Sequence, residues 1–233
     1  MTAATRGRVK AVLFDLDGTL ADTAADLGYA VNLQRVTRGL EPLPLHALRP
    51  HVSQGARGML RTAFGLQPEH PDYAALRDEF LEVYFENLLR DTRLFDGMHA
   101  LLDGLERAGL PWGIVTNKLT RYTEPLVAGL GLAQRAACVI CGDTCARAKP
   151  FPDPLLEAAQ RLRLDSADCL YVGDDHRDVQ AAHAAGMECL VAGYGYLGDG
   201  APPEEWGGLA VIAHPGEVMR FVQAAPGTGW PGA

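Results

Sequence analysis

Two apolar runs of the sequence are each followed by a group of aspartates. These are Asp15 and Asp17 after residues 9–14, and Asp174, Asp175 and Asp178 after residues 169–173. A helix N-cap explains one aspartate at each place, but not two or three. The pattern therefore indicates carboxylates that act together.

Carboxylates that meet in one place repel each other unless a cation lies between them. Oxygen ligands with positions left open for water and phosphate favour Mg2+. A carboxylate beside a bound phosphate can attack it and form an aspartyl-phosphate. A second carboxylate can protonate the leaving oxygen and later activate water. The aspartates therefore predict Mg2+-dependent chemistry at a phosphate group.

Polar residues also follow the apolar runs 112–116 and 137–141. The first run ends in Thr116, Asn117 and Lys118, and Lys149 follows the second after a loop. The Thr116 hydroxyl and the Asn117 backbone N–H could donate hydrogen bonds to a phosphate. Lys149 could neutralise the charge that develops on it. We include Lys118 with Thr116 and Asn117 among the candidate substrate-binding residues.

The apolar runs alternate with segments of helical periodicity. The strands we expect cover residues 9–14, 112–116, 137–141, 169–173, 188–192 and 209–213. The helices we expect between and after them cover about residues 96–108, 120–129, 152–162, 177–185 and 214–222. This alternation predicts an α/β fold, a Rossmann-like doubly wound parallel sheet whose ligands lie beyond the carboxyl ends of the strands.

The sequence between the first two strands is different. Asp22 and Thr23 give an N-cap signal for a helix to about residue 38, and from there to about 93 the periodicity is helical, with prolines and no convincing strand. We therefore expect an inserted all-helical cap domain at residues 23–94, and a core domain made of residues 1–22 and 95–225. Residues 226–233 are rich in Pro and Gly, so we expect a loose tail.

Composition narrows the class of partner. The chain has 233 residues and a net charge of −8, which argues against nucleic acid as a partner. No apolar stretch approaches the ~20 residues of a membrane span, and no secretory signal is evident. We expect a cytoplasmic protein, monomeric or homodimeric, that acts on a small molecule.

The four motifs together resemble those of the haloacid dehalogenase-like superfamily. They are Asp-x-Asp-Gly-Thr at residue 15, Thr-Asn at 116, Lys-Pro at 149 and Gly-Asp-Asp-x-x-Asp at 173. The resemblance implies that Asp15 is the nucleophile, Asp17 the general acid/base, and Thr116 and Lys149 phosphate ligands. It also implies that Mg2+ is held by Asp15, the Asp17 carbonyl and Asp174, with Asp178 in support. Many members have Ser where this chain has Asp175.

The helical insert resembles the cap of the phosphoglycolate phosphatase-like branch, with residues 51–60 as its substrate-facing loop. Segments 94–98, 112–118 and 193–196 resemble proteobacterial phosphoglycolate phosphatases, some of which act as N-acetylmuramic acid 6-phosphate phosphatases. The resemblance implies hydrolysis of a phosphate monoester, with 2-phosphoglycolate as the first candidate. A sugar-phosphate mutase and a non-enzymatic binding module of the same fold stay open.

The cap segment contains no lysine, so the carboxylate of a substrate would have to meet an arginine there. We assign this role to Arg57, which follows Gly55 in the substrate-facing loop, because a guanidinium can hold a carboxylate with two parallel hydrogen bonds.

Overall fold

The computed structural model describes residues 9–222. Within them, a six-stranded sheet has the order β5-β4-β1-β6-β7-β8, with every neighbouring pair parallel. Its strands are β1 Ala11–Phe14, β4 Trp112–Val115, β5 Cys138–Ile140, β6 Cys169–Gly173, β7 Glu188–Ala192 and β8 Ala210–Ile212. The α/β fold expected from the sequence is confirmed, and β1 lies inside the sheet, with β4 on one side and β6 on the other.

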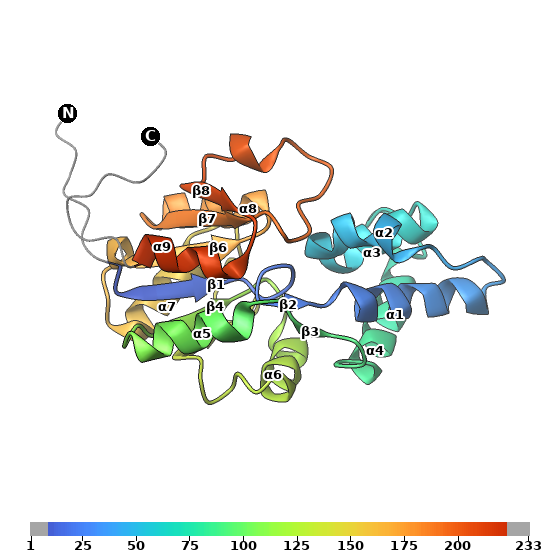
Figure 1. The fold of residues 1–233 in the computed structure, drawn as a ribbon. Coiled ribbons are helices and arrows are strands. Elements are labelled where there is room, and N and C mark those ends of the chain that lie inside the picture. The colour runs from blue at the N-terminus through green and yellow to red at the C-terminus, as the bar shows by residue number, and fades with distance from the viewer. Residues whose placement is uncertain (1–8, 223–233) are drawn as a thin grey trace.

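Helices cover both faces of the sheet (Figure 1). They are α5 Met98–Arg107, α6 Thr120–Gly129, α7 Asp153–Leu162, α8 His176–Ala184 and α9 Val218–Val222. Short 3-10 turns lie at Ser166–Asp168, Pro203–Glu205 and Pro215–Glu217. The expected helix 214–222 is therefore a 3-10 turn beginning at Pro215, followed by the short α9.

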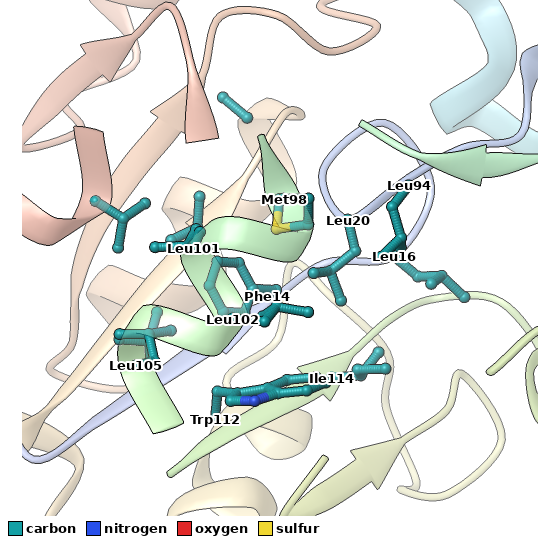
Figure 2. Packing of buried hydrophobic residues seen from close by; sticks show 14 of the residues in the cluster. Phe14, Leu16, Leu20, Leu94, Met98, Leu101, Leu102, Leu105, Trp112 and Ile114 are labelled. Carbon is teal, nitrogen blue, oxygen red and sulfur yellow. The ribbon is translucent and has the colours of Figure 1, made fainter. Parts of the chain in front are cut away.

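Alternate residues of β1 enter two different cores, because successive side chains of a strand point to opposite faces. Val12 and Phe14 pack with α5 and α9, whereas Ala11 and Leu13 pack with α7 and α8. Figure 2 shows Phe14 among the leucines of α5, with Trp112 of β4 beside it. Both faces of the strand are buried, which explains its continuous apolar sequence.

A separate group of helices lies beyond the carboxyl end of β1 (Figure 1). It consists of α1 Ala24–Thr37, α2 Leu45–Leu48, the 3-10 helix η1 Arg49–Gln54, α3 Gly55–Phe64 and α4 Tyr73–Glu86. These helices have a hydrophobic core of their own, which includes Leu27, Leu48, Met59, Leu60 and Phe80.

Two short strands connect this helical group to the sheet. β2 Ala21–Asp22 pairs antiparallel with β3 Arg93–Leu94, with Ala21 opposite Leu94. The sequence did not predict this ribbon, because two residues cannot show a strand periodicity. The ribbon brings the entry and the exit of the helical group together.

Helix α1 begins where the N-cap signal placed it, but not by side-chain capping. Thr23 occupies the N-cap position without a side-chain cap, since its hydroxyl donates to Asp17 instead. The expected loose tail, residues 226–233, lies outside the described residues, as do residues 1–8 and 223–225. None of the helices in residues 9–222 is long and apolar enough to cross a membrane.

Candidate active site

The predicted motifs meet because their strands are neighbours. Asp15, Thr116 and Asp174 directly follow β1, β4 and β6, which are adjacent in the sheet. The ladder continues one residue into the motif at Asp15, whose N–H donates to Val172 (2.9 Å). The carboxyl ends of the three strands therefore hold these side chains at one edge of the sheet.

Lys149 lies at the centre of a buried network. Its ammonium is 3.1 Å from Asp15 Oδ1 and 2.7 Å from Asp178 Oδ1, and it also donates to the hydroxyl of Tyr171 (2.8 Å). The Lys149 side chain is 3% exposed. Burial disfavours the charged ammonium, but the two carboxylates outweigh it and hold the pKa of Lys149 above its ordinary value. Lys149 is thus a fixed positive charge beside Asp15.

Asn117 positions Lys149 through the backbone. Its side-chain amide donates to the Lys149 carbonyl (2.9 Å) and accepts from the Lys149 N–H (3.0 Å). From the sequence, only the backbone N–H of Asn117 was expected to have a role. The side chain fixes the loop that carries the lysine.

Asp15, Asp174 and Asp178 form an acidic group in which one carboxylate oxygen from each residue lies within 4.8 Å of the other two. Burial raises the pKa of Asp15 to about 6 and that of Asp174 well above its ordinary value. Lys149 contacts two of the three carboxylates, so the group is short of positive charge. An all-oxygen donor set with excess negative charge fits a hard divalent cation.

The loop after β1 has little room around Asp174. Gly18 has a φ of +84°, and a Cβ on it would lie 2.0 Å from Asp174 Oδ2. The Thr19 hydroxyl donates to Asp174 Oδ1 (3.1 Å), and the Tyr196 N–H donates to Oδ2 (2.8 Å). The glycine of the first motif thus lets the loop approach the carboxylate of the fourth.

Asp17 lies outside this acidic group and pairs with a second lysine. The Lys118 ammonium is 2.9 Å from both carboxylate oxygens of Asp17, and the Thr23 hydroxyl donates to Oδ1 (2.6 Å). Lys118 was predicted to bind substrate. In the structure it lines a cavity, but its ammonium is paired with Asp17. The two predicted catalytic aspartates therefore have separate lysine partners.

A cavity of about 300 Å3 separates the strand ends from the helical group. We call its strand-end side the floor: Asp15, Asp17, Thr116, Asn117, Lys118, Lys149 and Asp178. We call the side formed by the helical group the roof: Leu27, Val52, Ser53, Gln54, Gly55, Ala56, Phe80, Leu81 and Tyr84. The floor is mostly charged or polar, whereas most of the roof is apolar.

The structure does not bring Arg57 to the cavity. Gly55 and Ala56 line it, but the side chain of Arg57 is exposed in the first turn of α3 and makes no hydrogen bond or ion pair with any residue in the described range. The first turn of α3 thus brings its backbone, and not its guanidinium, toward the cavity.

An arginine that the sequence analysis did not single out lines the cavity instead. Arg177 Nε and Nη2 donate to the two oxygens of Asp175 (2.8 Å each), and Nη2 also donates to the Ser53 carbonyl (2.7 Å). Although burial opposes it, Arg177 holds the pKa of Asp175 below its ordinary value. The Ser53 hydroxyl also donates to Asp174 Oδ2 (3.0 Å), so the roof touches the strand ends at two points.

The comparison with protein families agrees with the geometry. The family model for haloacid dehalogenase-like hydrolases matches residues 12–192. This span contains all four motifs and the helical group.

Two similar proteins are named for different phosphatase activities. The chain is 41% identical over 220 residues, 94% of the chain and 97% of the relative, to an N-acetylmuramic acid 6-phosphate phosphatase of Pseudomonas aeruginosa. It is 46% identical over 215 residues, 91% of the chain and 95% of the relative, to a phosphoglycolate phosphatase of Xanthomonas campestris pv. campestris. Both relatives are phosphatases, and they differ in the ester named.

A solved structure shares the fold. The crystal structure of a predicted phosphoglycolate phosphatase from Haemophilus somnus 129pt superposes with a TM-score of 0.82 at 24% identity, covering 93% of this chain and 99% of that one.

Proposed function

The chain belongs to the haloacid dehalogenase-like hydrolase family and is a phosphoric monoester hydrolase, and from this premise we propose that it hydrolyses a small carboxylated phosphate ester at the cavity between floor and roof. The observation that carries the proposal is the position of Asp15. It lines the cavity, lies 3.1 Å from the Lys149 ammonium and belongs to the acidic group at the strand ends.

Asp15 is the proposed nucleophile. One of its carboxylate oxygens attacks phosphorus and forms a bond to it, while the bond from phosphorus to the leaving oxygen breaks. Lys149 favours the charged form of Asp15, and its ammonium attracts the phosphate oxygens. Thr116, at the end of the neighbouring strand, is the proposed hydrogen-bond donor to the phosphate.

Asp17 is the proposed acid and base. It gives a proton to the leaving oxygen as the ester bond breaks. It then takes a proton from the water that attacks the aspartyl-phosphate, and the bond from phosphorus to Asp15 breaks to release inorganic phosphate. Lys118 and Thr23 hold the Asp17 carboxylate in place through both of these proton transfers.

We propose Mg2+ as the cation, held by Asp15, Asp174 and the Asp17 carbonyl, with Asp178 in support. When bound, the cation supplies positive charge that attracts the phosphate and stabilises the charge developing on it. The buried carboxylates that Lys149 leaves uncompensated support this assignment.

We propose that residues 23–94 act as a cap over the site and that 2-phosphoglycolate is the first candidate substrate. The second candidate, N-acetylmuramic acid 6-phosphate, is favoured by the size of the cavity, about 300 Å3, and by its apolar roof, which can pack against a sugar ring with its substituents. Both esters carry a carboxylate, and they differ greatly in bulk.

The test is phosphate release from a panel of esters. The panel contains 2-phosphoglycolate, N-acetylmuramic acid 6-phosphate, a hexose 6-phosphate and p-nitrophenyl phosphate, each with Mg2+ and with the Asp15→Asn variant as control. We expect release from at least one of the two carboxylated esters at a higher kcat/KM than from the hexose 6-phosphate. Equal kcat/KM for all sugar esters would contradict selection of a carboxylate.

A further inference from the structure

One tyrosine of the roof has a buried hydroxyl without a partner. Tyr84 of α4 is 1% exposed, and its Oη makes no hydrogen bond of good geometry with any described residue. In residues 9–222, one other buried side-chain atom shares this property, Gln34 Oε1, and Gln34 does not line the cavity. The neighbouring Lys118 ammonium can donate toward the Tyr84 oxygen but cannot accept the hydroxyl proton. Since burying an unpaired hydroxyl is unfavourable, the Tyr84 hydroxyl needs an explanation.

The ring of Tyr84 is fixed by its aromatic neighbours. It stacks on Phe80 with ring centroids 6.4 Å apart and an interplanar angle of 7°, and it packs against Tyr122 at 6.0 Å. All three rings line the cavity. A rotamer change that gave the hydroxyl to solvent would break these contacts, so the hydroxyl stays buried at the cavity wall.

The charged neighbours of Tyr84 locate its hydroxyl relative to the chemistry. The Lys118 ammonium lies 4.8 Å from the centre of the Tyr84 ring and is hydrogen-bonded to both oxygens of Asp17. In the proposed reaction, Asp17 faces the leaving oxygen. In that reaction, Tyr84 therefore lies near the leaving group, on the same side of the cavity as Lys118.

We propose that the Tyr84 hydroxyl donates a hydrogen bond to a polar substituent on the alcohol part of the substrate, a carboxylate, hydroxyl or amide oxygen a few bonds from the ester oxygen. This inference rests on the proposed function and makes Tyr84 a specificity-determining residue. The flanking rings of Phe80 and Tyr122 pack against the carbon skeleton that carries the substituent.

The chemistry of the hydroxyl agrees with this role. Burial raises the pKa of Tyr84 to about 12, against a smaller opposing effect of the Lys118 charge. The hydroxyl thus keeps its proton in neutral solution and can donate. A site with a buried unpaired donor discriminates against an analogue that offers no acceptor.

The experiment compares Tyr84→Phe with the native enzyme on two esters. One is whichever of 2-phosphoglycolate and N-acetylmuramic acid 6-phosphate is hydrolysed with the higher kcat/KM. The other is phenyl phosphate, whose alcohol part carries no acceptor. We expect the ratio of the two kcat/KM values to fall about tenfold in the variant, the effect of one lost hydrogen bond.

Thermal unfolding distinguishes this role from a merely structural one, which would predict a lower Tm for Tyr84→Phe. We expect the Tm of Tyr84→Phe to be equal to or higher than that of the native enzyme, because the variant removes a buried hydroxyl without a partner. Tyr73→Phe is the matched control, since Tyr73 is a buried tyrosine on the same helix that does not line the cavity. It should keep the native ratio.

An unchanged ratio in Tyr84→Phe would overturn the inference. It is the result expected if water, and not the substrate, accepts the hydrogen bond of the hydroxyl. Equal losses on both esters together with a lower Tm would also overturn it, since they would assign Tyr84 to packing. These outcomes leave the proposed function intact. That function fails separately if the native enzyme with Mg2+ releases no phosphate from any ester of the panel, and the inference then fails with it.

Discussion

The floor and the roof of the cavity are built from opposite kinds of interaction. On the floor, Lys149 contacts Asp15 and Asp178, and Lys118 contacts Asp17, so each charge is held by another. On the roof, most lining side chains are apolar, and the Tyr84 hydroxyl is unpaired. In the proposed function, the floor recognises what every substrate shares, a phosphate, and the roof meets what differs between substrates.

From this contrast we expect floor and roof substitutions to have different effects on activity. A floor variant that acts on the phosphate should lower the turnover of every ester alike. Asp17 is the exception on the floor, because the loss of a proton donor matters most for esters with poor leaving groups. A roof variant should change the ratio between esters. Four experiments test this contrast, and the one with the greatest expected loss of activity comes first.

Asp15→Asn should lower kcat by roughly 10⁴-fold or more on every ester, because the amide cannot form the acyl-phosphate bond. The measurement is steady-state phosphate release, with circular dichroism to confirm the fold. A folded variant within tenfold of the native rate would exclude Asp15 as the nucleophile.

Removal of divalent cations should bring phosphate release down to the level of Asp15→Asn. The acidic group of Asp15, Asp174 and Asp178 would then lack the charge that balances it. The assay follows activity after dialysis against EDTA and on return of Mg2+ or Zn2+. We expect Mg2+ to restore activity and Zn2+ to restore little; full activity in the chelated enzyme contradicts the metal assignment.

Asp17→Asn should lower kcat by about 10²–10⁴-fold while leaving substrate binding, because the amide keeps the size of the carboxylate but carries no transferable proton. Single-turnover kinetics should show the loss mainly for esters with poor leaving groups. If KM alone changed, Asp17 would be a binding residue.

Arg177→Ala and Arg57→Ala compare an arginine that lines the cavity with an exposed arginine that does not. Arg177 joins Asp175 to the Ser53 carbonyl of the roof, so its loss should cost roughly tenfold in kcat/KM, the effect of a charge-assisted hydrogen bond that is partly exposed. Arg57 is exposed and should cost less than about twofold. A larger loss for Arg57, confined to carboxylated esters, would restore it as the specificity residue.

The floor could be predicted from sequence because each of its motifs follows a buried strand. The apolar runs before Asp15, Thr116 and Asp174 carry a strong strand signal, and parallel strands end at a common edge. The lysine partners of the two aspartates were not resolved in this way, since motif order gives no distances.

Of the roof, the sequence predicted a helical insert and, through the resemblance, a substrate-facing loop at residues 51–60, of which residues 52–56 line the cavity. Tyr84 reads as a core residue of an amphipathic helix, and its unpaired hydroxyl shows only once the aromatic packing is known. Arg177 and Ser53 are far apart in the sequence, so no local pattern predicts their contact. Arg57 was chosen because its segment lacks lysine, and composition could not show that the arginine lining the cavity, Arg177, would come from α8.

The β2–β3 ribbon has a consequence for how this molecule could change over generations. Because Ala21 lies opposite Leu94, the chain leaves the sheet and returns to it at a single point. A hairpin turn of about two residues could join the paired strands there. The helical excursion could therefore be exchanged as one unit to admit new leaving groups while the motif residues at the strand ends stay in place, provided that the new segment again supplies contacts such as those of Thr23 with Asp17 and Ser53 with Asp174.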